Sequence, residues 1–319
     1  MKHENILVVG GSGFVGRHLV ARLAAEGRRV TVPTRRRERA KHLLMLPTVD
    51  LVEADIHDDA ALAALVAGKD AVVNLVGILH GSAGTPYGPE FKRAHVDLPQ
   101  RIARTCAAAG VKRFLHMSAL GADPAGPSMY LRSKGDGERA AASEPALDVT
   151  VFRPSVVFGP EDRFLNLFAS LQALFWVMPL ANAGARLQPI YVGDVAQAMV
   201  NALDNESTYD KTYELAGPAV YTLAQLVRFA GEASGHPRPI LPLPDFAGRI
   251  QALVLELMPG ETLMSRDNLD SIKTPNVAHA PIAEELGIEP VAMEAIAPAY
   301  LAGNTVRARH SVRRADAHR

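Results

Sequence analysis

Tyr130 and Lys134 are the residues of this 319-residue chain whose types and spacing most directly indicate chemistry. They stand at positions i and i+4, so on a helix they share one face. A phenol is a weak acid at neutral pH, but a neighbouring ammonium favours its phenolate and lets it exchange a proton with a substrate. The same ammonium can bind the hydroxyls of a sugar. Ser118, at the end of an apolar run, is a candidate hydrogen-bond donor to a substrate carbonyl.

The first sixteen residues have the pattern of a dinucleotide-binding turn. The run Ile6 to Val9 predicts a buried strand, and a helical pattern begins at about Phe14. Between them Gly10 permits a tight bend, Gly13 lets backbone N–H groups approach a pyrophosphate, and Gly16 lets the helix lie close to the strand. The helix N-terminus adds unpaired N–H groups and a partial positive charge. The predicted dinucleotide contacts here are Gly10, Gly13, Phe14, Val15 and Gly16.

The residues after the second predicted strand, Arg29 to Thr34, indicate which dinucleotide is bound. An NAD site usually has an acidic residue here, whose carboxylate takes the ribose hydroxyls. This chain has Arg35 and Arg36 instead, and a guanidinium can hold a 2′-phosphate with charge-assisted hydrogen bonds. The alternative is that the arginines solvate a loop, which is our interpretation of Arg37 and Arg39. We therefore expect NADP(H) rather than NAD(H).

Two further strand ends contribute candidates. Asp55 follows the third predicted strand, Leu51 to Ala54, where its carboxylate could accept from an adenine amino group. The alternative is a helix cap, for which Asp58 is better placed. Gly77 follows the fourth strand, Ala71 to Val76, where the backbone must pass close to the dinucleotide. Both Asp55 and Gly77 are therefore predicted cofactor contacts.

Strands and helices alternate as far as the strand Val149 to Phe152, which predicts right-handed crossovers and a parallel sheet. Beyond it prolines multiply and helical patterns dominate. The predicted fold is α/β, a Rossmann-type doubly wound parallel sheet with a smaller, mostly helical C-terminal lobe. We assign residues 1–157 and returning segments at about 187–217 to the dinucleotide domain, 158–186 and 218–302 to the lobe, and 303–319 to a disordered basic tail, with contact to acidic lipid or a partner as the alternative for the tail.

Composition excludes several classes of protein. The formal net charge is zero, with 34 basic and 34 acidic residues, which does not favour nucleic-acid binding. A single cysteine, Cys106, rules out an internal disulfide and is expected to be a buried apolar residue. Neither a signal peptide nor an 18-residue apolar run is evident. The histidines, cysteine and carboxylates show no metal-ligand spacing, so we expect no metal. The stretch Phe164 to Leu180 comes nearest to a span and is expected to be a core helix, with a membrane-surface face as the alternative.

The chain resembles the short-chain dehydrogenase/reductase superfamily in its extended or atypical branch. The resemblance is carried by the glycine triplet, by Tyr130-x-x-x-Lys134, and by Arg153-Pro154 followed by Gly159-Pro160. The stretches Tyr-Leu-Arg-Ser-Lys-Gly-Asp-Gly-Glu and Pro-Ser-Val-Val-Phe-Gly-Pro-Glu-Asp-Arg-Phe-Leu-Asn are more specific. They resemble the dehydrogenase-like accessory subunits of respiratory complex I and their bacterial relatives. The resemblance implies that NADP(H) is the cofactor and that Tyr130, Lys134 and Pro154 belong to its site.

Two hypotheses about function remain open at this point. The first is an oxidoreductase acting on a hydrophobic carbonyl or quinone-type substrate. The second is a non-catalytic NADPH-binding structural or assembly protein of the respiratory chain. In active relatives a second Ser or Thr follows the serine at the end of the fifth strand and polarises the substrate carbonyl. In this chain the fifth predicted strand is Arg113 to Met117, and Ala119 occupies the position of the second hydroxyl. Ser118 would have to supply the hydroxyl instead. We expect a cytoplasmic protein, with contact to a respiratory complex or the inner face of a membrane as an alternative, and no nucleic acid.

Overall fold

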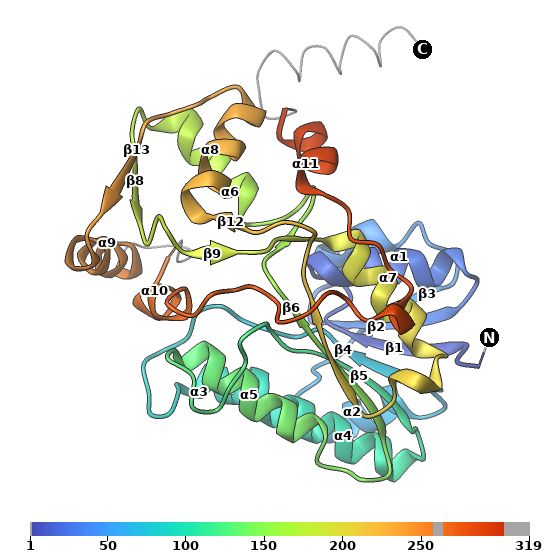
Figure 1. Cartoon of the computed structure of the whole chain (residues 1–319). Coiled ribbons are helices and arrows are strands. Elements are labelled where there is room, and N and C mark those ends of the chain that lie inside the picture. Colours follow the sequence, from blue (N-terminus) through green and yellow to red (C-terminus); the bar gives the residue numbers. More distant parts are fainter. Residues whose placement is uncertain (1, 258–263, 303–319) are drawn as a thin grey trace, which may run out of the picture. The chain divides into compact units, whose positions relative to one another are not determined.

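The computed structural model describes residues 2–257 and 264–302. Seven strands form a parallel sheet in the order β11-β6-β5-β4-β1-β2-β3, with helices packed around it (Figure 1). This confirms the predicted fold class. The strands of the sheet are β1 (Asn5–Val9), β2 (Arg29–Thr34), β3 (Val49–Glu53), β4 (Ala71–Asn74), β5 (Arg113–Met117), β6 (Asp148–Pro154) and β11 (Lys211–Leu215).

Apolar side chains on both faces of the sheet bury the central strands. In β1, Leu7 and Val9 face the core formed with α2 and α4, while Ile6 and Val8 are equally buried. Consecutive strand residues point to opposite faces, so an unbroken apolar run indicates burial on both. Cys106 lies in the same core, fully buried, as predicted. The helices around the sheet are α1 (Phe14–Ala25), α2 (Asp59–Val66), α3 (Pro89–Phe91), α4 (Leu98–Ala109), α5 (Met129–Ala141) and α7 (Val192–Leu203), with short helices η1 (Arg37–Leu43), η2 (Lys92–Asp97), η3 (Glu206–Thr208) and η4 (Glu284–Leu286).

A buried arginine joins β5 to the end of α7. Arg113 is 1% exposed, and its guanidinium donates to the carbonyl oxygens of Leu203 at 3.2 Å and Ala202 at 2.7 Å. It also lies over the ring of Tyr209, 4.4 Å from the centroid. Burial lowers the pKa of Arg113 to about 10, so the side chain stays charged at neutral pH. Arg113 therefore satisfies carbonyl groups that the end of a helix leaves without an intrahelical partner.

The chain divides into two compact units, each made of several segments. Unit 1 comprises Met1–Pro154, Val192–Leu215 and Ala278–Glu289, and unit 2 comprises the rest. The segment 278–289, which the sequence assigns to the lobe, packs in unit 1 because Glu285 accepts hydrogen bonds from Lys211 and Tyr213 of β11. These contacts join positions more than seventy residues apart, so no local sequence pattern predicts them.

Unit 2 contains short strands as well as helices. Its core packs α6, α8 and α11 together, around residues such as Phe158, Leu226 and Ala297. No described helix is long and apolar enough to cross a membrane. The elements of unit 2 are β7 (Val157–Phe158), α6 (Leu165–Leu174), β8 (Met178–Ala181), β9 (Arg186–Leu187), β10 (Ile190–Tyr191), β12 (Tyr221–Thr222), α8 (Leu223–Ser234), β13 (Ile240–Leu243), α9 (Asp245–Leu257), α10 (Arg266–Ser271) and α11 (Met293–Leu301).

Two predictions about local structure need correction. The stretch Phe164 to Leu180 is not one core helix, because α6 ends at Leu174, Phe175 and Trp176 are exposed, and β8 follows. Pro179 cannot continue a helix but is tolerated in the short strand β8. The sequence pattern also predicts one long helix from Phe91 to Ala109, whereas the structure has a π-helical turn, η2, between α3 and α4. The expectation of a disordered tail concerns residues 303–319, which lie outside the described residues.

Candidate functional site

The predicted site residues of unit 1 follow the carboxyl ends of neighbouring parallel strands. In an open α/β sheet, ligands bind in the crevice outside these strand ends. Six strands of one sheet therefore bring together residues that are up to 144 positions apart in the sequence. The predicted residues are Asp55 after β3, Arg35 and Arg36 after β2, Gly10 after β1, Gly77 after β4, Ser118 after β5 and Pro154 at the end of β6.

The glycine turn has the close packing that the sequence predicts. Gly10 has φ +87°, a backbone conformation that L side chains rarely adopt, and Gly13 is the N-cap of α1. A Cβ at Gly16 would lie 2.4 Å from the oxygen of Gly10 and 2.6 Å from the Cα of Gly11. Gly11 is itself packed, since a Cβ there would meet the methyl groups of Val32 at 2.9 Å. The turn is therefore a backbone cradle of the kind that a pyrophosphate needs, with Phe14, Val15 and Gly16 in the first turn of α1.

The end of β2 and β3 collects positive charge. Thr34 holds the loop after β2, because its hydroxyl donates to the carbonyl of Arg36 at 3.0 Å, and the side chains of Arg35 and Arg36 are exposed. The hydrogen bond from the His57 N–H is the main reason that the pKa of Asp55 is lowered, and Arg93 and Arg35 add to this electrostatically. Asp58 caps α2 by accepting from the N–H of Ala61, so Asp55 is not the cap. Asp55 remains available to a ligand.

Arg93 was missed by the sequence analysis. It lies on η2, far from the second strand in the sequence, yet its charge acts on Asp55 and His57 together with that of Arg35. Burial is the main cause of the lowered pKa of His57, and Arg93 is the next. The fold thus brings a third arginine to this end of the sheet. The position of Arg93 follows from the tertiary packing of η2, which no local sequence pattern predicts.

Tyr130 and Lys134 lie on α5, as predicted, but burial dominates their acid–base properties. Burial raises the pKa of Tyr130 to about 12 and lowers the pKa of Lys134 to about 8. In the cofactor-free arrangement Tyr130 is therefore a phenol, suited to donate a proton. The Lys134 ammonium donates to the carbonyl of Met117 at 3.2 Å and lies 3.2 Å from where a Cβ at Gly77 would stand. The ammonium is therefore next to the backbone that follows β4.

Glu138 does not hydrogen-bond to Lys134. Its carboxylate pairs with the guanidinium of Arg153 through two hydrogen bonds of 2.8 and 2.6 Å. This bidentate pair joins α5 to β6, one residue before Pro154. Glu138 still acts on Lys134 electrostatically, opposing the fall in its pKa. Its main role in the structure is therefore to fix α5 against the sheet.

His95 is a further residue of the site that the sequence analysis missed. Its Nε2 accepts from the N–H of Ile78 at 3.0 Å, and its Nδ1 lies 2.8 Å from the hydroxyl of Ser133, which donates to the carbonyl of Tyr130. Because Nε2 accepts and Ser133 donates onward, the proton belongs on Nδ1. The imidazole thereby connects the backbone after Gly77 to α5. Its ring also packs edge-on against Tyr130, with centroids 5.6 Å apart.

A second buried histidine lies near the same ammonium. His116 of β5 has its Nδ1 3.2 Å from the amide nitrogen of Asn74, and Asn74 accepts from the N–H of Val76. Burial, with a smaller contribution from the charge of Lys134, lowers the pKa of His116 to about 3 and that of His95 to about 2. Both rings therefore stay neutral, which avoids a second positive charge beside Lys134. In the sequence both histidines look like ordinary core residues.

Ser118 has an unsatisfied hydroxyl. The residue is 3% exposed and its N–H donates to the carbonyl of Phe152 at 2.7 Å, but its Oγ has no hydrogen-bond partner among the described residues. A buried hydroxyl without a partner is costly unless a ligand or water satisfies it. Ala119, also buried, offers no donor. Ser118 is therefore the hydroxyl that this strand end can offer to a ligand.

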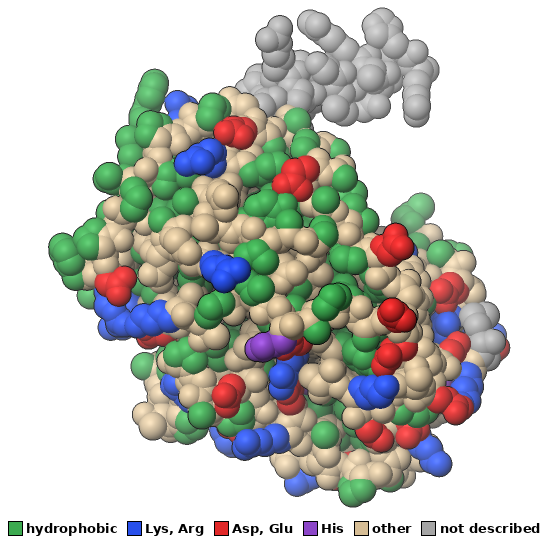
Figure 2. Space-filling view, in the orientation of Figure 1, with side chains coloured by type: hydrophobic (Ala, Val, Ile, Leu, Met, Phe, Trp, Pro, Cys, Tyr) green, Lys and Arg blue, Asp and Glu red, His purple; other side chains and the backbone are tan. Residues whose placement is uncertain are grey.

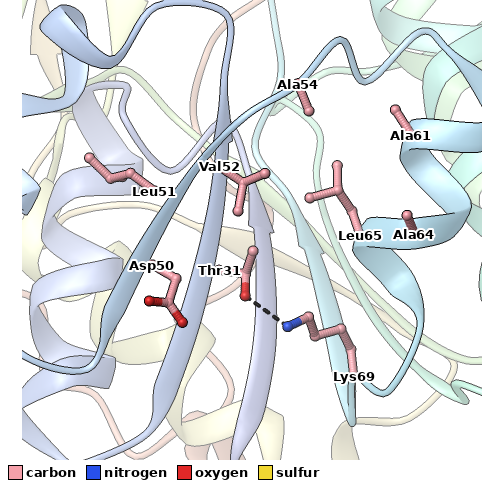
Figure 3. A pocket seen from close by; sticks show the side chains of 9 residues that line it. All are labelled: Thr31, Asp50, Leu51, Val52, Ala54, Ala61, Ala64, Leu65 and Lys69. Atoms are coloured by element: carbon pink, nitrogen blue, oxygen red, sulfur yellow. Dashed lines mark hydrogen bonds between the residues drawn. The ribbon is translucent and has the colours of Figure 1, made fainter.

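The residues present fit a bound dinucleotide. A Cβ at Gly11 or Gly16 would overlap its neighbours, the Ser118 hydroxyl lacks a partner among the described residues, and the Lys134 ammonium lies next to Gly77. A separate groove of about 540 Å³ lies along β2, β3 and α2 (Figure 3). There Lys69 donates to the hydroxyl of Thr31 at 2.7 Å. None of the predicted site residues lines that groove, so we do not associate it with the dinucleotide.

Comparison with known proteins agrees with this geometry. Residues 6–216 match the NAD dependent epimerase/dehydratase family. The mouse NADH dehydrogenase [ubiquinone] 1 alpha subcomplex subunit 9, mitochondrial, is 32% identical over 90% of this chain and 77% of its own length. A ceramide reductase of Caulobacter vibrioides is 31% identical over 75% of this chain and 74% of its own.

Solved structures share the fold. The dTDP-glucose 4,6-dehydratase DesIV of Streptomyces venezuelae, solved with NAD and TYD bound, superposes with a TM-score of 0.64. The match covers 75% of this chain and 85% of that one at 23% identity, which shows the fold alone. The sequence matches go further, because they extend over most of the chain and of its relatives. The chain therefore belongs to the NAD dependent epimerase/dehydratase family, among relatives of the alpha subcomplex subunit 9 of NADH dehydrogenase.

Proposed function

We propose that the chain is an NADP(H)-dependent oxidoreductase that acts on a hydrophobic carbonyl or quinone-type substrate. The observation that carries this proposal is the Lys134 ammonium, buried beneath Gly77 and one helical turn from Tyr130. Burying a lysine without an ion pair costs free energy, which its lowered pKa reflects. An apolar residue at this buried helix position would cost less free energy than a lysine, so a purely structural role does not explain Lys134.

In the proposed reaction each residue has one task. Lys134 binds the ribose hydroxyls of the nicotinamide half, and the backbone of Gly10 to Gly16 binds the pyrophosphate. Ser118 Oγ donates a hydrogen bond to the substrate carbonyl, and Tyr130 donates a proton to the same oxygen. The bound cofactor supplies a hydride to the carbonyl carbon. A ketone, NADPH and a proton thus give an alcohol and NADP⁺.

A hydrophobic substrate is favoured by the relatives and by the sequence. One relative is named a ceramide reductase and another a subunit of a ubiquinone-reducing dehydrogenase, so the printed names include a lipid and a quinone. The stretch after β7 is rich in large apolar side chains, among them Phe164, Phe168 and Leu171, which pack against the unit 2 core. These observations support the substrate class and not an individual compound.

The test is oxidation of NADPH by the purified protein. Absorbance of the reduced nicotinamide is followed with long-chain ketones and with a short-chain quinone as acceptors. The proposal expects turnover that rises with the chain length of the ketone, because a longer chain buries more apolar area. Bound NADPH that none of these acceptors oxidises would leave only the second candidate function.

Replacing Arg35 and Arg36 together by alanine is expected to weaken NADPH binding by about 100-fold, since hydrogen bonds to charged groups contribute roughly 1.5–3 kcal/mol each. NADH lacks the 2′-phosphate, so its affinity should stay the same. Isothermal titration calorimetry with both nucleotides measures the difference. Arg37→Ala is the matched control, because Arg37 is also exposed but begins η1. Equal losses for NADH and NADPH would contradict the assignment.

The second candidate function is a non-catalytic NADPH-binding protein of the respiratory-chain or quinone system, in contact with a respiratory complex or a membrane surface. Ala119 favours it, because it removes one donor from the substrate side of the site. The relative that is a respiratory subunit favours it as well. Ligand binding alone stabilises a fold by about 2.7 kcal/mol at a hundredfold excess over Kd, so retained NADPH is useful without turnover. Thermal unfolding with and without NADPH measures this effect.

A further inference from the structure

Helix α9 of unit 2 packs through its small residues and exposes its large ones. Ala252 is fully buried, and a Cβ at Gly248 would lie 2.6 Å from the Cβ of Ala181 in β8. In contrast, Phe246 is 69% exposed and Leu257 is 77% exposed. Amphipathic helices of globular domains normally turn their large apolar side chains to the core. The arrangement of α9 is the reverse.

The exposed side chains form a continuous strip. Phe246, Ile250, Val254 and Leu257 follow one another at spacings of four, four and three, so they share one face along the whole helix. None of the four carries a charge. Two of the three charged residues of α9 form ion pairs beside the strip, Glu256 with Arg266 at 3.0 Å and Arg249 with Asp270 at 2.9 Å. The third, Asp245, is exposed at the first position of the helix.

The neighbouring strands add to the exposed apolar surface. Trp176 is 80% exposed and lies just before β8, which pairs with β13 and packs against α9. The guanidinium of Arg238 lies 5.0 Å from the Trp176 ring centroid, and no described carboxylate pairs with it. Figure 2 shows hydrophobic side chains gathered at the margin of unit 2 where α9, β8 and β13 lie. We call this surface the apolar margin: Phe175, Trp176, Leu241, Phe246, Ile250, Val254 and Leu257.

We propose that the apolar margin docks on the surface of an anionic phospholipid bilayer. An amphipathic helix can lie in the plane of a membrane interface with its apolar face among the acyl chains, and a tryptophan beside a cation suits the headgroup level. At a rise of 1.5 Å per residue, the 13 residues of α9 would lie along roughly 20 Å of that interface. The inference rests on the membrane contact in the second candidate function and is independent of turnover.

Charge complementarity selects an anionic bilayer as the occupant. Arg238 lies at the edge of the apolar margin, where its Nε donates to the carbonyl of Gln172 at 2.9 Å and its guanidinium forms no ion pair with a described carboxylate. Unit 2 also continues from α11 into residues 303–319, whose sequence holds five arginines and one aspartate in a chain of zero net charge. Basic residues near a surface add attraction to acidic lipids, and apolar burial with a basic segment is the usual pair of signals for stable attachment.

Flotation with lipid vesicles tests the proposal without cofactor or substrate. The full chain should float with vesicles of phosphatidylcholine and phosphatidylglycerol, and less with phosphatidylcholine alone. Ile250→Glu and Trp176→Ser should each reduce binding by about tenfold or more, because each removes the burial of one large side chain. Removing residues 303–319 should reduce only the component that depends on anionic lipid.

Met45→Glu is the matched control, since Met45 is 87% exposed in unit 1, and it should bind vesicles like the wild type. Unchanged NADPH affinity shows that each variant is folded. The proposal is overturned if the wild type does not float, or if Ile250→Glu floats equally well. It is also overturned if light scattering shows a dimer that Ile250→Glu dissociates, because the apolar margin would then bind a second copy.

Discussion

Gly16→Ala should reduce the affinity for the dinucleotide by about 100-fold or more, equivalent to roughly 2.7 kcal/mol. The added Cβ would meet the Gly10 oxygen at 2.4 Å and two Gly11 backbone atoms at 2.6 and 2.7 Å. All three are backbone atoms, so no side chain can rotate away and the cradle must move. Overpacking of this kind also destabilises a fold, typically by about 1–3 kcal/mol. Calorimetric titration with NADPH and urea unfolding of the cofactor-free protein measure the two effects.

Two other glycines provide a graded comparison. Gly13→Ala should have a smaller effect, because its Cβ would meet only the Gly10 oxygen, at 3.2 Å. Gly184→Ala should be neutral, since nothing lies within 4 Å of its Cβ position and its φ is not in the left-handed region. If all three variants bound NADPH equally well, the glycine turn would not be the pyrophosphate site.

Tyr130→Phe should lower kcat by about 10²–10⁴-fold and leave NADPH affinity unchanged, because general acid catalysis typically contributes that factor. The phenyl ring keeps the contacts with Phe91 and His95, whose ring centroids lie 6.4 and 5.6 Å away. The variant thus loses the proton donor and retains the packing. Stopped-flow measurement of NADPH oxidation, with the affinity measured separately, distinguishes the two quantities.

The pH profile provides a second readout of the same mechanism. The pKa of Tyr130 is raised to about 12, so the phenol stays protonated throughout the accessible range. The pKa of Lys134 is lowered to about 8, so the ammonium that binds the ribose is lost as the pH rises through that value. Accordingly kcat/KM for NADPH, which reports the free protein, should fall above about pH 8. Lys134→Met should bind weakly at every pH and lack this step. A Tyr130→Phe variant with wild-type kcat would refute the assigned proton donor.

The sequence predicted six of the seven strands because each of those six has a local signature, whereas β11 was placed only within the returning segment at about 187–217. The apolar runs, the glycine turn and the polar residues at strand ends all lie within short windows, and a parallel sheet places those ends along one edge. Gly10, Gly77, Ser118 and Lys134 could therefore be assigned to one region before any coordinates. The cofactor contacts themselves remain predictions.

The residues that were missed depend on contacts without a local pattern. His95 reaches Ile78 and Ser133 from the π-helical turn η2, and a π turn has no reliable sequence signature. Glu138 follows Lys134 by four positions on α5, but its bidentate pair is with Arg153 of another element, β6. Likewise β8 pairs with β13 across about sixty residues, although most of β8 lies in the stretch that the sequence predicted to be a core helix. Tertiary contacts decided each case.

The ends of β6 and β11 show how this fold can change its partner specificity. The chain enters unit 2 directly after Pro154 and again directly after Leu215, and these two residues are register partners on adjacent strands. These two segments of unit 2 therefore begin at the same level of the sheet, directly after the last paired residues of β6 and β11. Lengthening an inserted loop costs little entropy, about 0.6 kcal/mol per doubling. These two segments of unit 2 can therefore change in length, and with them part of the surface that unit 2 offers to partners, without a change of strand register in the sheet. The third segment of unit 2 begins elsewhere, after Glu289.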